Sequence, residues 1–144
     1  MNSLAMKQRG MTLIELLLVI VILGIIVSIA LPGYQDSVRK ARRADSQAVM
    51  LELAQWMERF YTENGRYDQD RAGAAVAPPP ILLASPREGT TIFYNMVVAT
   101  PDDQSFTITA TPNGGQVGDK CGNLTLNQAS TRGVSTSVPV SECW

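Results

Sequence analysis

Histidine is missing from the 144 residues of this chain. Without histidine, Ser-His-Asp and Cys-His catalysis are excluded, and so is the commonest zinc ligand. Cysteine is nearly absent as well, with Cys121 and Cys143 too far apart for a Cys-x-x-Cys redox motif. We therefore expect no enzymatic activity, no metal and no cofactor, and a structural disulfide in an oxidising compartment.

Charge is also sparse, at 17% of residues, and the formal net charge is −1. Both basic residues near the start, Lys7 and Arg9, precede every acidic residue, so the chain from Met11 onward has ten basic against thirteen acidic residues, a net charge of −3. A chain of this charge lacks the electrostatic character of a general nucleic-acid binder.

What the sequence does have is one long apolar run, Met11 to Leu31, which contains a single charged residue, Glu15. As a helix rising ~1.5 Å per residue it would span about 31 Å, close to the roughly 30 Å of a bilayer hydrocarbon core. The run is therefore expected to cross a membrane.

The order of segments at the N-terminus is unusual for a secretory signal. The short basic leader, residues 1–10, ends in Gly10, and this small residue precedes the apolar run instead of following it. Cleavage after Gly10 would remove the leader and keep the apolar helix in the mature protein. Hydropathy alone leaves an uncleaved signal anchor open as the alternative.

The junction Gly10-Met11-Thr12-Leu13-Ile14-Glu15 resembles the class III leader junction of type IV pilins and pseudopilins. That resemblance implies cleavage between Gly10 and Met11 by a prepilin peptidase and N-methylation of Met11. The family usually has Phe at this first mature position, so Met11 is a departure. The resemblance also implies a pilin-like α+β fold, with a long N-terminal helix packed on a small antiparallel sheet.

Glu15 is a carboxylate inside the apolar run, which costs on the order of 2.5–3.5 kcal/mol on insertion scales. The amine released by cleavage at Met11 is a candidate partner, and the resemblance favours the amine of a neighbouring subunit in a filament. Pairing would fix the axial register of assembly. The alternative is a Glu15 side chain that reaches the membrane interface.

Gly24 and Pro32 weaken the helix between them, because glycine costs about 1 kcal/mol against alanine and proline removes a backbone hydrogen bond. The pilin resemblance implies that the segment from Gly24 to Pro32 can unwind during assembly. A close-packing site at Gly24 and a simple kink at Pro32 form the alternative.

Residues 32–65 form an amphipathic second helical half that continues across Pro32 and stops at Asn64-Gly65. Trp56, Met57 and Phe60 are interpreted as core residues that dock a sheet. The expected apolar face consists of Val38, Ala41, Ala44, Ala48, Leu51, Leu53, Trp56, Met57 and Phe60.

The basic cluster Arg39-Lys40-Ala41-Arg42-Arg43 could bind lipid head groups, DNA or acidic residues of a neighbouring subunit, or could simply be solvated. By the count of positive charges this side would be cytoplasmic. The cysteine pair and the pilin resemblance instead favour a cytoplasmic leader and a periplasmic head, as a single-pass protein of the bacterial inner membrane that later moves to an extracellular pilus.

The head, residues 66–144, begins with an irregular Ala/Pro-rich loop over 66–89 and continues with alternating apolar and polar residues. Strands are expected at Thr91–Thr100, Ser105–Thr111 and Gly122–Asn127, with a turn at Pro101–Asp103 and a weaker edge strand at Val134–Val140. A Cys121–Cys143 disulfide would resemble the C-terminal disulfide-bounded region of type IVa pilins. Asn123-Leu-Thr125 fits a glycosylation sequon.

The sequence thus predicts a structural, minor subunit of a type IV pilus, with roles in pilus assembly, twitching motility, adhesion and DNA uptake. The expected partners are the prepilin peptidase, the inner-membrane assembly platform and motor, the major pilin, other minor pilins and membrane lipid. DNA is a possible partner without support from the residues. A type II secretion pseudopilin and a membrane-anchored adhesin or DNA receptor acting alone are the alternatives.

Overall fold

The computed structural model describes residues 11–144, so the predicted leader, with the cleavage residue Gly10, lies outside the described range. The chain divides into two compact units between Ser37 and Val38. Helix α1 (Leu13–Asn64) belongs to both units. From here on, the second unit, residues 38–144, is called the head.

Helix α1 is 52 residues long and begins and ends with recognisable caps. At its start, the amide of Glu15 donates a hydrogen bond of 3.3 Å to Oγ1 of Thr12, which satisfies one of the free amides of the first turn. At its end, Gly65 has a φ of 76° and donates its amide to the carbonyl of Tyr61. The predicted stop at Asn64-Gly65 is confirmed. Pro32 lies inside the helix, and the segment from Gly24 to Pro32 is helical throughout.

Within the first unit, α1 is almost entirely apolar from Leu16 to Leu31. Residues 11–37 are exposed, and the most apolar window of α1 has a mean hydropathy of 3.1. Length and composition therefore make α1 a helix that can cross a membrane.

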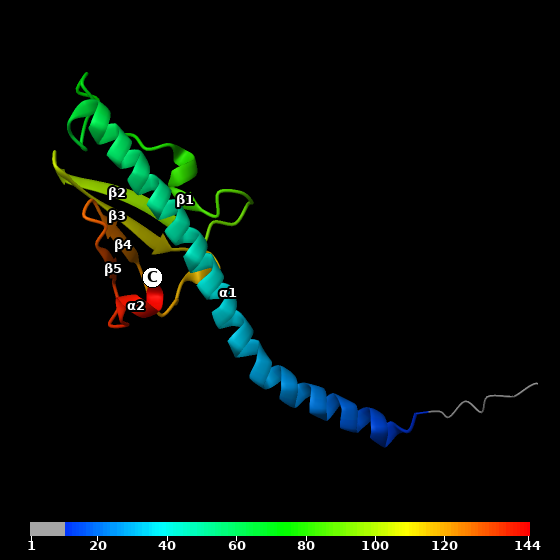
Figure 1. The fold of residues 1–144 in the computed structure, drawn as a ribbon. Coiled ribbons are helices and arrows are strands. Elements are labelled where there is room, and N and C mark those ends of the chain that lie inside the picture. Colours follow the sequence, from blue (N-terminus) through cyan, green and yellow to red (C-terminus); the bar gives the residue numbers. More distant parts are fainter. Residues whose placement is uncertain (1–10) are drawn as a thin grey trace, which may run out of the picture. The chain divides into compact units, whose positions relative to one another are not determined.

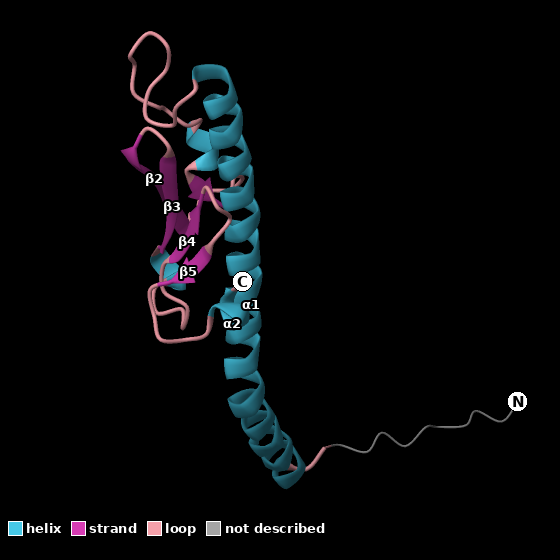
Figure 2. Cartoon of the chain, turned by 60° about the vertical axis from the view of Figure 1, so that its left-hand side comes forward, coloured by secondary structure: helices cyan, strands magenta, loops and turns pink. Residues whose placement is uncertain are grey.

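The head contains one five-stranded antiparallel sheet with the strand order β1-β2-β3-β4-β5. The strands form one layer along the second half of α1 (Figures 1 and 2). This confirms the predicted α+β fold, a long helix on a small antiparallel sheet. The strands are β1 (Ala84–Ser85), β2 (Tyr94–Asp102), β3 (Ser105–Pro112), β4 (Leu124–Asn127) and β5 (Arg132–Val134).

The predicted strand ends differ from the structure in several places. Strand β2 begins at Tyr94 instead of Thr91, and β4 begins at Leu124 instead of Gly122. The turn expected at Pro101–Asp103 begins later, because β2 continues to Asp102 with a register shift between Ala99 and Asp102, an irregularity of the kind that tolerates a proline. The edge strand expected at Val134–Val140 stops at Val134, and Val140–Cys143 form the short helix α2, whose N-cap is Pro139. Proline fixes a backbone angle that suits a helix start.

The core lies between α1 and the inner face of the sheet. Tyr94, Phe106, Ile108 and Leu124 from the strands are fully buried there. The inward stripe of α1 differs from the expected one, because Ala44, Ala48 and Leu51 are exposed. The buried residues of α1 are instead Arg43, Ser46, Val49, Met50, Leu53 and Met57.

Candidate functional site

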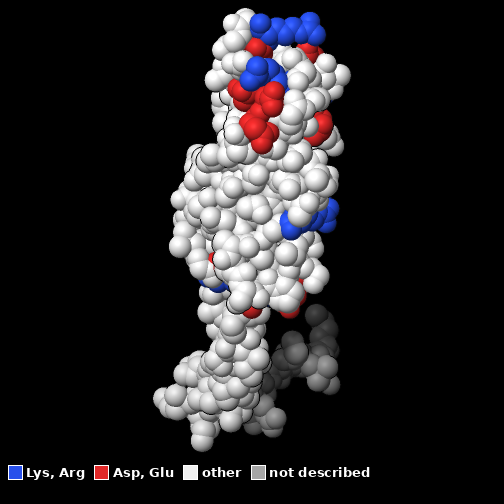
Figure 3. All heavy atoms as spheres, turned by 90° about the vertical axis from the view of Figure 1, so that its left-hand side faces the viewer, with Lys and Arg blue, Asp and Glu red and all other residues white. Residues whose placement is uncertain are grey.

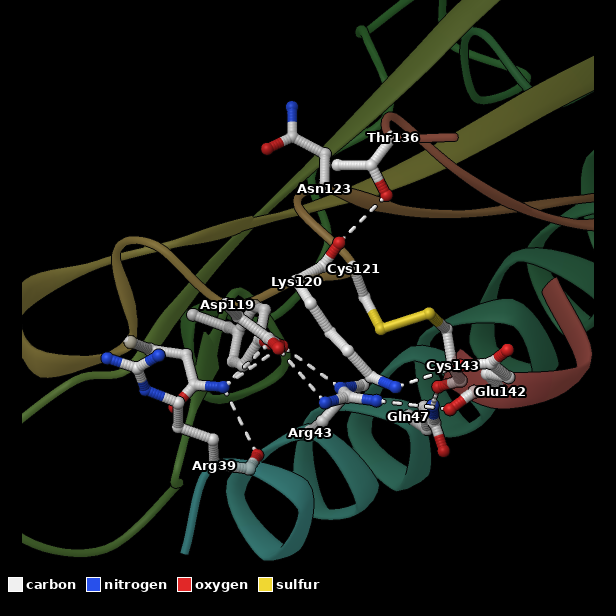
Figure 4. Close-up of polar contacts among 12 residues, drawn as sticks. Arg39, Arg43, Gln47, Asp119, Lys120, Cys121, Asn123, Thr136, Glu142 and Cys143 are labelled. Carbon is white, nitrogen blue, oxygen red and sulfur yellow. Dashed lines mark hydrogen bonds and ion pairs between the residues drawn. A yellow bond between two sulfur atoms is a disulfide. The ribbon is translucent and has the colours of Figure 1, made fainter. Parts of the chain in front are cut away.

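Arg43 and Asp119 form a buried ion pair between α1 and the loop that precedes Cys121 (Figure 4). Nε and Nη2 of Arg43 each donate a 2.9 Å hydrogen bond to a different carboxylate oxygen of Asp119. This bidentate geometry is the strongest form of such a pair. Arg43 is 5% exposed and Asp119 is 6% exposed, so neither charge is solvated to a large extent.

Further polar groups surround this pair. The hydroxyl of Tyr94 and the amide nitrogen of Gln116 each donate to Oδ2 of Asp119, and Nη1 of Arg43 donates to the carbonyl of Glu142. Burial alone would raise the pKa of Asp119, but the hydrogen bonds from Arg43, Tyr94 and Gln116 and the charge of Arg43 outweigh burial and lower it. Burial is also the main reason why the pKa of Tyr94 rises to about 12.

The lowered pKa of Asp119 makes the stability of the head depend on pH. A carboxylate with a depressed pKa in the folded state contributes stability above its unfolded value, near 3.9, and loses it as the pH falls toward the folded value. We expect the urea concentration at half-unfolding of the full-length chain in detergent micelles to decrease as the pH is lowered below 4. The Asp119→Asn variant should unfold at a lower urea concentration at pH 7, and its urea midpoint should depend less on pH between pH 4 and pH 2. A pH dependence as steep as that of the wild type would contradict this.

The pair also changes the interpretation of the basic cluster. Arg43 is buried, Arg42 places its guanidinium 3.7 Å from the ring centroid of Phe93, and Nη1 of Arg39 donates to the carbonyl of Gly118. Lys40 is exposed. Three of the four cations are therefore engaged with the head itself, which limits the cluster as a surface for lipid or DNA.

The outer face of the sheet is uncharged. By the strand register, the outward side chains are hydroxyls, amides and small apolar groups, and the middle of this side of the head is free of charged atoms in Figure 3. The outward residues are Asn95, Val97, Ala99, Thr107, Thr109, Thr111, Thr125, Asn127 and Gly133. Among the described residues, none of these outward side chains is a cation that could bind a phosphate group.

A disulfide joins Cys121 and Cys143 across 22 positions of the sequence (Figure 4). The segment beyond it is held by polar contacts as well, since the amide of Gln47 donates to the carbonyl of Cys143 and the indole of Trp144 donates to the carbonyl of Gly133. Lys120 and Glu142 form an exposed ion pair beside the disulfide. The C-terminus is thus attached to both α1 and the sheet.

The first unit holds the residues predicted to act in assembly. The carboxylate of Glu15 has no hydrogen bond or ion pair within residues 11–144, and both Glu15 and Met11 are exposed. Processing at Gly10 and Met11, the role of Glu15 and the unwinding between Gly24 and Pro32 stay predictions. The residues that sequence reasoning missed are Asp119, Tyr94 and Gln116. Nothing in the local sequence of Asp119 marks it as the partner of Arg43, which lies 76 positions away.

Two family models match the chain. One, described as "Type IV minor pilin ComP, DNA uptake sequence receptor", matches residues 32–125. The other, described as "Prokaryotic N-terminal methylation motif", matches residues 5–31. Together they cover the apolar helix and most of the head.

Individual proteins are similar over parts of the chain. A "Type IV major pilin protein PilE1" of Neisseria gonorrhoeae is 42% identical over 82 residues, covering 56% of this chain and 47% of that protein. A "Type II secretion system core protein G" of Pectobacterium carotovorum is 32% identical over 82 residues, covering 56% of this chain and 53% of that protein. The match thus spans about half the length of these curated relatives.

Among solved structures, the non-core minor pilin PilV of Neisseria meningitidis has the same fold. Its TM-score is 0.51 at 22% sequence identity, and the match covers 72% of this chain and 93% of that one.

Proposed function

The chain belongs to the type IV pilin family, in the group whose model describes the minor pilin ComP, and from this we propose that it is a minor subunit of a type IV pilus. The observation that carries the proposal is that one helix has an exposed apolar first half and contributes its second half to a compact head. A helix with that surface needs lipid or other helices around it. The segments Phe106–Pro112 and Asp119–Gln128 also resemble the minor pilin PilE.

The methylation motif implies processing by a prepilin peptidase and assembly with other pilins. We propose cleavage after Gly10, N-methylation of Met11, and storage as a single-pass protein of the inner membrane with a periplasmic head. The inner-membrane platform and motor would then move the subunit into an extracellular filament. The role is structural, and twitching motility, adhesion and DNA uptake are its proposed consequences.

Mass spectrometry of sheared and purified pili tests this proposal directly. We expect a peptide that begins at methylated Met11, present at a small fraction of the major subunit. Full-length protein that keeps residues 1–10 and stays in the membrane fraction would overturn it. A filament that forms only under secretion conditions would instead support the pseudopilin alternative, to which the similarity with a type II secretion protein points.

Glu15→Ala is expected to leave the protein in the membrane but reduce its incorporation into sheared filaments by at least about tenfold, because the buried charge pair that would fix subunit register is lost. The measurement is the ratio of protein in sheared pili to protein in membranes, by immunoblot. Asp36→Ala removes an acidic residue from the same helix outside the apolar run and should incorporate normally. Equal ratios for wild type and Glu15→Ala would contradict the assignment.

A second candidate function, a DNA receptor, is favoured by the family description of ComP. The charges of the head give it limited support, since residues 38–144 carry ten basic and eleven acidic side chains. If the head binds duplex DNA, Lys40→Ala should weaken binding at low salt, because Lys40 is the exposed cation of the cluster. Arg39 and Arg42 are half-buried, and Arg43 is buried. A gel-shift titration of the full-length chain in detergent distinguishes this function, and its absence at low salt would exclude it.

A further inference from the structure

Of the three residues expected in the core, Met57 is buried in it, Trp56 packs against it and Phe60 lies outside it. Both aromatic residues are half-buried on α1, and their rings stack with centroids 5.5 Å apart and an interplanar angle of 25°. They line an open hollow of about 340 Å³ together with Arg59 and Glu63. The four residues occupy positions i, i+3, i+4 and i+7, which lie on one face of a helix.

The two charged residues of this hollow, Arg59 and Glu63, are exposed. Within residues 11–144, neither Arg59 nor Glu63 forms a hydrogen bond through its side chain or an ion pair. They could pair with each other at their i, i+4 spacing, but the order Arg before Glu is the weaker orientation on a helix. Five guanidinium donors and two carboxylate acceptors therefore remain available at the rim.

We propose that the hollow lined by Trp56, Arg59, Phe60 and Glu63 binds a neutral sugar unit of an oligosaccharide. A pyranose ring has an apolar C–H face that can cover an aromatic ring, and hydroxyl groups at its edge that both donate and accept hydrogen bonds. The aromatic pair can pack against the apolar face of the sugar. The carboxylate of Glu63 can accept hydrogen bonds from sugar hydroxyls, and the guanidinium of Arg59 can donate hydrogen bonds to their oxygens.

The charge of the hollow favours a neutral ligand over a polyanion. One cation and one carboxylate give it no net charge, so a phosphate backbone would gain at Arg59 and be repelled at Glu63. Trp56 is also packed against the core on one side, which holds its ring in place before a ligand arrives. The proposed sugar site is separate from the proposed filament role, and it does not depend on it.

Tryptophan fluorescence of the full-length chain tests the proposal, because Trp56 and Trp144 are the two tryptophans. In a Trp144→Phe variant, Trp56 is the only tryptophan that contributes to the fluorescence. The detergent must have no sugar head group, so that it does not compete with the probes. The probes are maltohexaose, chitohexaose and lacto-N-tetraose, each up to about 10 mM, a range that covers weak single-site affinities. Oligodeoxythymidylate serves as the anionic probe.

We expect a saturable change in Trp56 emission with at least one neutral oligosaccharide. Arg59→Ala and Glu63→Gln should each weaken binding about tenfold, since each loses a charge-assisted hydrogen bond. Arg71→Ala removes an exposed arginine elsewhere in the head and should bind as the parent does. Glu63→Asp, which keeps the charge and shortens its reach, guards against a folding defect in Glu63→Gln, and circular dichroism should be the same for all variants.

Three outcomes would overturn the proposal. The first is the absence of a saturable response to any of the neutral probes. The second is binding that persists unchanged in both Arg59→Ala and Glu63→Gln. The third is Arg59-dependent binding of oligodeoxythymidylate without binding of the sugars, which would make the hollow a nucleobase site.

Discussion

Arg43→Ala should destabilise the head by about 3–5 kcal/mol, because it leaves the carboxylate of Asp119 buried without its counter-charge. Asp119 is 6% exposed, so water cannot replace the two hydrogen bonds that Arg43 donates. The same substitution removes the bond to the carbonyl of Glu142 and so loosens α2. Urea unfolding of the full-length chain in detergent, followed by far-UV circular dichroism, measures the change.

Lys120→Ala is the matched control for this prediction. Lys120 also pairs with an acidic residue near the disulfide, but the side chains of Lys120 and Glu142 are 57% and 54% exposed. We expect its loss to change stability by less than about 1 kcal/mol. Similar effects for Arg43→Ala and Lys120→Ala would show that burial does not decide the strength of the pair.

A double-mutant cycle separates the pair from general packing. The double variant of Arg43→Ala and Asp119→Ala should be less destabilised than the sum of the two single variants, because removing both partners removes the unpaired buried charge. Additive effects would contradict the role assigned to the ion pair.

Replacing Cys121 and Cys143 together with serine is the second change for which we expect a large effect, about 3 kcal/mol. A cross-link that closes a loop of 22 residues restricts the unfolded chain by roughly that amount. The segment it closes contains only short elements, namely the four-residue strand β4, the three-residue strand β5 and the four-residue helix α2. Elements this short have little stability without a covalent connection.

Without the disulfide, the C-terminal segment should unfold at a lower urea concentration than the rest of the head. Trp144 follows Cys143 directly, and its indole donates to the carbonyl of Gly133 while Arg132 lies over its ring at 5.3 Å. In the double serine variant, Trp144 emission should change at lower urea concentration than circular dichroism at 222 nm. In the wild type with an intact disulfide the two transitions should coincide, and coincidence in both proteins would contradict a separately unfolding C-terminus.

Much of the architecture was predictable because its signals are local. The run from Met11 to Leu31 is apolar at nearly every position, the stop at Asn64-Gly65 is a helix terminator, and β3 alternates strictly from Ser105. Each of these patterns lies within one continuous segment, so no distant residue is needed to interpret it. The family resemblance at Gly10–Glu15 is local in the same sense.

The wrong predictions of buried residues depended on which face of a segment meets another segment. The inward stripe of α1 passes through Arg43, which the sequence assigned to the basic cluster because hydropathy cannot anticipate its buried partner Asp119. Trp56 and Phe60 were placed inside for the opposite reason, since large aromatic residues are usually buried. Both errors concern side-chain partners, which a single segment does not contain.

The amino-acid order alone therefore establishes a long apolar helix, an amphipathic continuation and a small antiparallel sheet, since hydrophobic periodicity and helix caps act over a few residues. Only the folded head decides that Arg43 faces Asp119 and that Arg42 lies over the ring of Phe93. It also decides that Trp56 and Phe60 lie beside the charged side chains of Arg59 and Glu63. The physical reason is that burial and charge pairing are properties of surfaces brought together from distant parts of the chain, and these surfaces exist only after the helix has docked on the sheet.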